Sequence, residues 1–338
     1  MSITVLKPGL QSSFQDRGRI GYQHLGVPVN GAMDERAHRL ASLLVGNPAT
    51  RATLEITLVG PVLRFNAPAC FALAGADLGA CLNGDPIPAM RPHRARAGDL
   101  LTFSSRAEPG RGLRAYLAVH GGYAIEPVMG SESTYLRGGF GGLQGRALDK
   151  GDVIGLRRPL RGTDAGLAAL ETAMRELRLY LPATLVGTPR AALRVLPGSH
   201  WDLFDAESQV AFVQTEFRVS PASDRMGYRL TGPGIHQTSA AQMLSEAACF
   251  GSVQVPADGQ PIVLMADRQT TGGYAKIAQV ISIDLPLLAQ YAPGQGVRFT
   301  LTTLEDAQRL DQAREQAYAA LETALAPLRA QLLARAQP

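Results

Sequence analysis

The sequence is poor in lysine, and this shortage limits what its surface can bind. Only three of its 33 Lys and Arg residues are lysines, at positions 7, 150 and 276. The formal net charge is only +4, and no block of basic residues with interleaved aromatic residues marks a nucleic-acid surface. We therefore expect no nucleic-acid partner, and each lysine becomes more informative about function.

Cysteine and histidine are also scarce. The three cysteines, Cys70, Cys81 and Cys249, form an odd set without regular spacing, which argues against a disulfide scaffold and against zinc. Each lies among apolar or small residues, so we expect three buried, reduced thiols. The six histidines lack the spacing of metal ligands, and we expect no metal site.

Long hydrophobic runs are missing as well. The N-terminal stretch MSITVLKPGLQSSFQDRG has no apolar segment of the kind found in secretion signals. No window approaches the roughly 18 apolar residues that cross a bilayer. We expect no membrane contact and a cytoplasmic protein.

Glycine and proline, by contrast, are abundant. The 36 glycines and 22 prolines separate short runs rich in Val, Ile, Leu and Phe, such as residues 54–58, 114–119 and 262–266. This pattern predicts a mainly β protein with some α-helix, in barrels or sandwiches.

Three segments instead have the spacing of apolar residues that is typical of helices. They are residues 33–44, 165–179 and 304–336. Pro327 is expected to break or kink the last of them. We expect that helix to pack on its own chain rather than on a partner.

Two parts of the sequence share an order of motifs. QDRGRIGY at 15–22 resembles SDRMGYR at 223–229, and three later residues recur about 190 positions further on. The pairs are Glu55 and Glu246, Gly60 and Gly251, and Asp77 and Asp267. This order suggests a duplication that produced two similar β domains, and clefts between domains are favoured ligand sites.

The stretch DRQTTGGYAK at 267–276 is the first candidate site. Arg268 can bind a carboxylate or phosphate through two hydrogen bonds, and Lys276 offers a mobile positive charge. Thr270 and Thr271 offer hydroxyl donors, and the pair Gly272-Gly273 permits a positive φ and close approach of a ligand. The alternative interpretation is a solvated hairpin turn with ordinary surface charges.

Other candidate residues lie outside that stretch. Asp224, Arg225 and Tyr228 form a similar polar segment, although an ion pair that holds a turn would explain it equally well. Glu246 could add a carboxylate to the same cleft, but a structural role is at least as plausible because Glu55 occupies the equivalent place. His120 ends a predicted strand, where histidines are more often structural than catalytic.

A glycine-rich loop at residues 136–146 carries two arginines. Exposed backbone N–H groups in such a loop could hold an anion. The spacing of a Walker A motif is absent, and a loop that binds a partner is equally consistent with the sequence.

Three longer motifs resemble one protein family. They are FQDRGRIGYQHLGVPVNGAMD at 14–34, SDRMGYRLTGP at 223–233 and VPADGQPIVLMADRQTTGGYAKIAQVI at 255–281. They resemble the allophanate hydrolase subunit 2 family, also called the biotin-dependent carboxyltransferase family. The resemblance implies two tandem cyclophilin-like β-barrel domains, at 1–190 with a glycine-rich excursion and at 191–303, followed by a C-terminal helix at 304–338.

The resemblance also implies an activity that needs partners. The family includes the C subunit of an ATP-dependent 5-oxoprolinase, which acts with two further proteins, one KipI-like and one LamB/YcsF-like. That complex uses ATP, with Mg, to convert 5-oxo-L-proline to L-glutamate. The chain shows no biotin-carboxylase region and no biotinyl domain, so we expect no biotin attached to it. A biotin-dependent carboxyltransferase and a non-catalytic KipI antagonist, as in KipA, stay open as alternatives.

The expected chemistry assigns roles to the candidate residues. A lactam carbonyl is a poor electrophile, and its phosphorylation needs positive charge near the transferred phosphoryl group. We therefore expect Lys276, Arg225 and Asp267 to be catalytic. The expected substrate-binding residues are Asp224, Tyr228, Arg268, Thr270, Thr271, Gly272, Gly273, Glu246 and His120.

Overall fold

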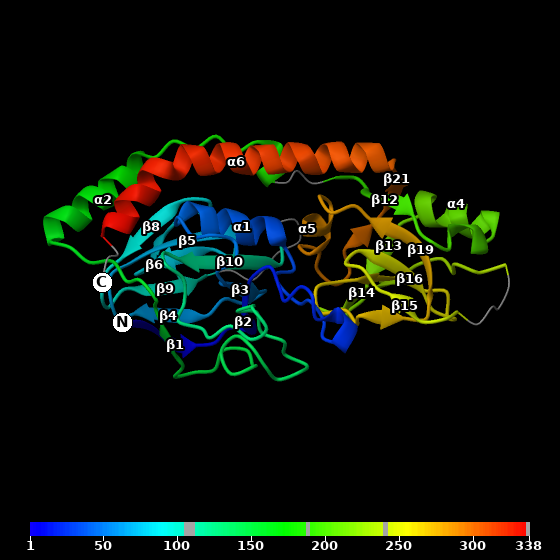
Figure 1. Cartoon of the computed structure of the whole chain (residues 1–338), viewed down its shortest axis with the longest axis horizontal. Helices are drawn as coiled ribbons and strands as arrows, with labels where there is room; N and C mark the ends of the chain where they lie inside the picture. Colours follow the sequence, from blue (N-terminus) through cyan, green and yellow to red (C-terminus); the bar gives the residue numbers. More distant parts are fainter. Residues whose placement is uncertain (105–111, 187–189, 239–242, 336–338) are drawn as a thin grey trace.

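The computed structural model describes residues 1–338 except 105–111, 187–189, 239–242 and 336–338. Figure 1 shows an elongated molecule with strands gathered toward its two ends and one long helix lying along both. We call the part that holds the strands from Ser2 to Gly155 the N-terminal β unit. The part that holds the strands from Leu193 to Leu301 is the C-terminal β unit.

Two sheets form the N-terminal β unit. In order across the first sheet, the strands are β11 (Val153–Gly155), β1 (Ser2–Lys7), β4 (Val62–Phe65), β9 (Leu100–Phe103), β6 (Ala80–Leu82) and β7 (Asp85–Pro86). The second sheet has the order β2 (Gln11–Gln15), β3 (Thr53–Thr57), β10 (Arg114–Val119), β5 (Ala69–Gly75) and β8 (Pro92–Ala95).

The second sheet is buried on both faces, which explains its continuous apolar runs. Along β10, Leu117 and Val119 point into the core between the two sheets, whereas Tyr116 and Ala118 point toward the covering helices. Side chains alternate between the faces of a strand, so every residue of β10 is buried.

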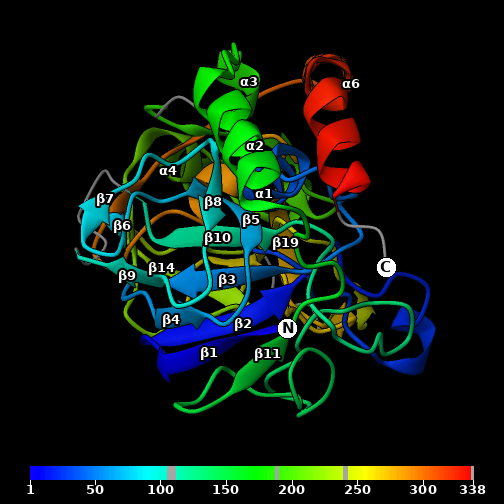
Figure 2. The ribbon, with the colours of Figure 1, turned by 90° about the vertical axis from the view of Figure 1, so that its left-hand side faces the viewer.

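Helices cover the outer face of that sheet. They are α1 (Glu35–Leu44), α2 (Asp164–Glu176), α3 (Ala183–Val186) and α6 (Leu304–Ala334). Figure 2 shows them gathered on one side of the strands. The Asp34 side chain accepts a hydrogen bond from the Ala37 N–H at 2.8 Å and so begins α1. The predicted apolar face of this helix, Ala37, Leu40, Ala41 and Leu44, is buried.

Helix α6 starts at the end of the C-terminal β unit and runs over the N-terminal one (Figure 1). Tyr318, Leu321, Leu325 and Leu328 are buried against the helical layer, so the prediction that it packs on its own chain is confirmed. Pro327 does not break it: the helix is continuous to Ala334, and its C-terminal part bends in Figure 1.

One sheet forms most of the C-terminal β unit. Its order is β20 (Gly296–Val297), β13 (Phe217–Val219), β14 (Gly227–Thr231), β17 (Ile262–Leu264), β16 (Ser252–Val255), β19 (Ala275–Val280), β12 (Leu193–Pro197) and β21 (Phe299–Leu301). Only Arg298 separates β20 from β21, so the two edges lie together and the sheet is a nearly closed barrel. The prediction of a mainly β chain with a C-terminal helix is confirmed.

Short elements complete this unit. They are η2 (Trp201–Leu203), α4 (Ala206–Gln214), α5 (Leu285–Leu288), and a small ladder of β15 (Glu246–Ala247) with β18 (Thr271–Gly272). A further short helix, η1 (Gln23–Leu25), follows β2. Met33, just before α1, is fully buried within the core of the C-terminal β unit and so joins the two units.

The strand pairing does not follow the repeat read from the sequence. That repeat equates β4 with β16 and β5 with β17. β16 and β17 pair directly, whereas β4 and β5 belong to different sheets. The motif spacing alone therefore does not describe how the two units are built.

One expected burial is wrong. Cys70 and Cys81 are buried, but Cys249 is exposed because it lies in the loop between β15 and β16. Within the described residues, no helix is long and apolar enough to cross a membrane.

Candidate functional site

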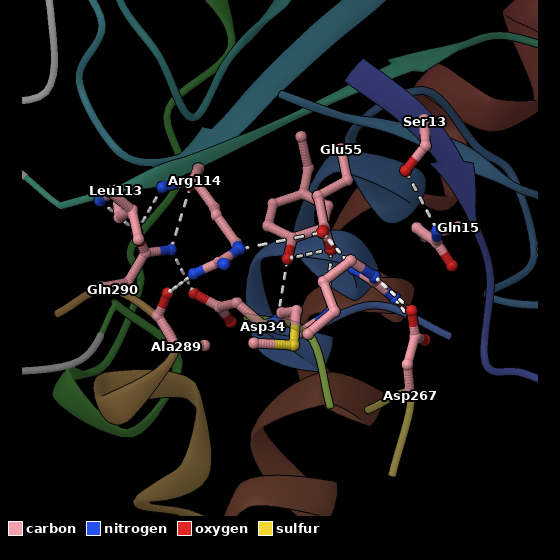
Figure 3. A network of polar contacts seen from close by, with 12 residues as sticks. Ser13, Gln15, Asp34, Glu55, Leu113, Arg114, Asp267, Ala289 and Gln290 are labelled. Atoms are coloured by element: carbon pink, nitrogen blue, oxygen red, sulfur yellow. Dashed lines mark hydrogen bonds and ion pairs between the residues drawn. The ribbon is translucent and has the colours of Figure 1, made fainter. Parts of the chain in front are cut away.

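A buried carboxylate from the N-terminal β unit lies at the centre of the contact between the units (Figure 3). Glu55 on β3 accepts hydrogen bonds from the Met33 N–H at 2.9 Å and from the Tyr116 hydroxyl at 2.7 Å. Burial and the Glu55 charge raise the pKa of Tyr116 well above its usual range, so the phenol remains a donor.

Arg225 reaches Glu55 from the C-terminal β unit. Its guanidinium forms an ion pair with Glu55 and donates to the Gly31 carbonyl at 2.6 Å. It also donates to both oxygens of Asp267, at 2.9 and 3.0 Å. These bonds use nearly all the donors of the guanidinium.

The charges of this group stabilise one another. Burial acts to lower the pKa of Arg225, but Asp267 and Glu55 outweigh it and the pKa is raised. Burial acts to raise the pKa of Glu55, but Arg225 and Arg114 outweigh it and the pKa is lowered. Arg225 and Glu55 therefore both stay ionised at neutral pH.

A second arginine approaches Asp267 through an asparagine. The Asn30 side chain donates to Asp267 at 2.8 Å and accepts a hydrogen bond from Arg19. Arg19 also donates to the Ser133 carbonyl. The segment 15–31 of the N-terminal β unit is thus tied to the loop that carries Asp267.

A third arginine extends the network along the same contact. Arg114 lies 3.8 Å from Glu55 and donates at 2.6 Å to the Tyr228 hydroxyl and to the Ala289 carbonyl. The Gln290 amide then bridges Asp34 and the backbone of Arg114, at 2.7 and 3.0 Å (Figure 3). These buried hydrogen bonds and ion pairs connect the two units through several partners at once and so hold them in one orientation.

A cavity of about 860 Å³ opens beside this network, between the two β units. Leu136 and Arg137 of the glycine-rich loop line it from one side, and Asp224 and Tyr228 line it from the other. Its size suits a small-molecule ligand, since such pockets hold roughly 300–1,000 Å³.

Lys276, which the sequence predicted to be catalytic, lies outside this cavity. The Lys276 ammonium forms an ion pair with Glu246 at 2.9 Å and donates to the Ala247 carbonyl, so it is neither in bulk solvent nor among the residues that line the cavity. His200 lies 3.5 Å from the same carboxylate, and the Ser199 hydroxyl lies 3.4 Å from it. The hydrogen bond with Lys276 lowers the pKa of Glu246.

The backbone fixes how His200 contributes to this cluster. Its Nδ1 accepts a hydrogen bond from the Lys276 N–H at 3.1 Å, which leaves the proton of the neutral ring on Nε2, facing Glu246. We call Ser199, His200, Glu246 and Lys276 the lysine cluster. It combines a cation, a carboxylate and an imidazole on a partly exposed surface of the C-terminal β unit.

The glycine pair lies next to the lysine cluster but serves a different purpose from the one expected. Thr271 and Gly272 pair with Ala247 and Glu246 in the small ladder, and the Thr270 carbonyl accepts from Ala248. Neither Gly272 nor Gly273 has a positive φ, so that expectation is wrong. A Cβ at Gly272 would lie 2.5 Å from the Gln254 amide, so a larger residue there would displace the end of that side chain.

Two of the predicted residues belong neither to the interface network nor to the lysine cluster. Arg268 packs over the Phe250 ring and donates to the Ala248 carbonyl at 3.2 Å. His120 is buried in the N-terminal β unit, where its Nδ1 is 2.7 Å from the Val45 carbonyl.

The structure therefore divides the predicted residues into two groups. Asp224, Arg225, Tyr228 and Asp267 meet at the interface of the units, and Glu246, Thr270, Thr271, Gly272, Gly273 and Lys276 meet around the lysine cluster. The sequence reading missed Arg19, Asn30, Arg114 and Tyr116. Arg19 belongs to the motif DRGR and Asn30 to the motif VNG. Both motifs lie within the family segment at 14–34, so that segment contained the signal that could have identified these two residues.

Comparison with known proteins identifies the family. Residues 25–301 match the model described as "Carboxyltransferase domain, subdomain A and B". The chain is 38% identical over 316 residues to the 5-oxoprolinase C subunit of Escherichia coli (strain K12), covering 93% of this chain and 96% of that protein. It is 36% identical over 313 residues to the 5-oxoprolinase C subunit of Haemophilus influenzae, covering 93% and 95%.

A solved structure agrees with these matches. The urea amidolyase of K. lactis superposes with a TM-score of 0.83 at 29% identity, covering 95% of this chain and 20% of that much longer one. The family resemblance read from the three motifs is confirmed. The chain belongs to the family of carboxyltransferase domains, subdomain A and B.

Proposed function

We propose that this chain is the C subunit of an ATP-dependent 5-oxoprolinase. It would act with a KipI-like protein and a LamB/YcsF-like protein to open 5-oxo-L-proline to L-glutamate. ATP, with its Mg, enters as a co-substrate, and activity requires the complete complex.

One observation carries this proposal. The match to the 5-oxoprolinase C subunit of Escherichia coli extends over 96% of that protein, whereas the chain spans only 20% of the K. lactis urea amidolyase. A relative that aligns along its whole length is the better guide to what a single chain contributes.

The lysine cluster is the group best suited to chemistry. Lys276 is a mobile cation held by one carboxylate, and an incoming anion can compete for it because Glu246 is 41% exposed at its side chain. Lys276 would stabilise charge on the lactam oxygen as it is phosphorylated. Thr271 and Gly272, on the adjoining ladder, would contact the substrate.

Arg225 and Asp267 take a different role in this proposal. Their polar atoms are engaged in the buried network, so neither is free to stabilise a transferred phosphoryl group. They would instead set the shape of the cavity between the units, where Asp224, Tyr228 and Arg137 are placed to contact a small molecule.

Reconstitution with the two partner proteins tests the proposal. We expect glutamate to form from 5-oxoproline and ATP only when all three proteins are present. Lys276→Met should lower turnover by about 100-fold or more, the scale of losing one transition-state donor. Lys150→Met, which alters an exposed lysine elsewhere, is the matched control and should leave turnover unchanged.

Other outcomes would contradict it. Full turnover in Lys276→Met would remove the lysine cluster from the chemistry. Carboxylation that depends on biotin, without glutamate formation, would support the carboxyltransferase alternative, which the family match and the urea amidolyase superposition favour. Complex formation without turnover of either substrate would leave the role of a KipI antagonist.

A further inference from the structure

A pocket on the N-terminal β unit is lined by cations and lies apart from both groups described above. Its volume is about 510 Å³. Four arginines line it, namely Arg51, Arg157, Arg158 and Arg329, and none of the described residues in its lining is acidic. Such a pocket attracts anions, and guanidinium groups match the geometry of oxyanions.

Acidic neighbours neutralise only part of this charge. Glu132 pairs with Arg51 at 2.9 Å and with Arg157 at 3.1 Å, and Glu322 lies 3.4 Å from Arg329. Among the described residues, no carboxylate lies within ion-pair distance of Arg158, whose side chain is exposed.

His120 gives the pocket a second polar feature. His120 lies in the wall of the pocket, and the residue is only 2% exposed. Nδ1 is 2.7 Å from the Val45 carbonyl, which can only accept, so Nδ1 carries the proton of the neutral ring. Nε2 is buried and has no hydrogen-bond partner among the described residues, which is costly in a native protein and leaves its lone pair able to accept from a bound donor.

The surroundings keep that nitrogen unprotonated. Burial lowers the pKa of His120, and the nearby Arg158 lowers it further. Nε2 therefore presents a lone pair inside a ring of positive charge. A ligand for this site must carry oxygen atoms that accept from arginine and also an O–H that donates to Nε2.

Arg158 lines the same pocket as His120, and its side chain is exposed. It packs on the turn after His120: a Cβ at Gly121, which has φ +79°, would lie 2.3 Å from the Cβ of Arg158. The exposed end of a long side chain can rotate away from this turn at little cost, whereas the backbone below it is fixed by the hydrogen bond from Gly121 N–H to Asn47 at 2.7 Å.

We propose that this pocket binds a small oxyanion that keeps an O–H at neutral pH, namely hydrogen phosphate or hydrogen carbonate. The arginines, with Arg158 foremost, bind its charged oxygens, and its hydroxyl donates to Nε2 of His120. Sulfate has the charge of hydrogen phosphate but carries no proton at this pH, so it lacks the group that Nε2 requires.

Calorimetric titration of the purified chain tests the site. The probes are phosphate, bicarbonate, sulfate and chloride at pH 7 and constant ionic strength, because screening changes surface electrostatics. We expect saturable binding of phosphate, of bicarbonate or of both, and at least tenfold weaker binding of sulfate. The relative affinities of the first two identify which anion the site serves.

Variants link that binding to the pocket. Arg158→Met should weaken binding at least tenfold, whereas Arg64→Met, on an exposed arginine of β4, should not change it. In the wild type, the ¹⁵N resonance of His120 Nε2 should shift on titration with the bound anion. This last measurement needs no change at the buried histidine and so does not depend on a variant folding.

Three results would overturn the proposal. The first is the absence of saturable binding by either protonated oxyanion. The second is sulfate binding as tight as phosphate binding, which would show that charge alone is recognised. The third is equal binding by Arg158→Met and the wild type, which would place the anion elsewhere on the surface.

Discussion

Two clusters of charge in this chain use the same chemistry in opposite surroundings. In the interface network, Arg225 and Glu55 side chains are 6% and 3% exposed, and each has several partners. In the lysine cluster, Lys276 is 11% exposed and Glu246 is 41% exposed. The first arrangement uses its charges to hold two β units together, and the second keeps its carboxylate in contact with solvent.

The comparison shows that residue type does not reveal the role of a charge. Asp267, Arg268 and Lys276 lie within ten residues of sequence, yet the first is part of the buried network and the last belongs to the exposed cluster. Burial decides the difference, because a buried ion is costly unless oppositely charged or hydrogen-bonding groups pair with it. Groups that are paired in this way cannot also bind a substrate.

The largest expected effect comes from breaking the buried network. Arg225→Met leaves Glu55 and Asp267 buried without their partner, and we expect it to lower the free energy of unfolding by about 3–5 kcal/mol. Urea denaturation measures this. Arg229→Met, on an exposed arginine of the same segment, is the control and should change stability by no more than about 0.5 kcal/mol. Equal stability of the two variants would mean that the network does not support the fold.

A smaller effect is expected when only the charge of Glu55 is removed. Glu55→Gln keeps the shape of the side chain but weakens its bonds with Arg225 and Arg114, at a cost of about 1–3 kcal/mol at neutral pH. Urea denaturation at several pH values measures the gap in the free energy of unfolding between this variant and the wild type.

The pH dependence of that gap has a defined sign. The pKa of Glu55 is lowered in the folded state, so its contribution is present above the unfolded pKa of about 4.3 and is lost as the pH falls through the folded pKa. The gap should therefore shrink in acid below about pH 4. A gap that stays constant through this range would contradict the assigned ionisation of Glu55.

The smallest effect on stability is expected in the lysine cluster. A double-mutant cycle with Lys276→Met and Glu246→Gln should give a coupling of about 0.2–1 kcal/mol, because the Glu246 carboxylate is 41% exposed and screened by solvent, and added salt should weaken it. A coupling above about 3 kcal/mol would place this pair in the same class as the buried network and remove the contrast between the two clusters.

Local features of the fold could be predicted from the sequence because their causes are local. The apolar spacing of Ala37, Leu40, Ala41 and Leu44 predicted α1, and the runs at 114–119 and 262–266 predicted β10 and β17. Cys249 was predicted wrongly because apolar neighbours in sequence do not make a loop residue buried.

The candidate site was less predictable because its contacts join distant parts of the chain. Arg225 and Glu55 are 170 residues apart, and Asn30 and Asp267 are 237 apart. No periodicity or local motif specifies such a pair. The same limit explains why local motifs did not separate Arg225, which pairs with Glu55 and Asp267, from Lys276, which pairs with Glu246.

The sequence by itself determined which segments become strands and helices and which family the chain joins, because hydrophobic periodicity, turn residues and long motifs are all properties of neighbouring residues. The tertiary structure alone decided which charges are buried with several partners and which stay near the surface. That outcome depends on how far the folded chain removes each group from water, and burial of this kind exists only once the two β units have come together.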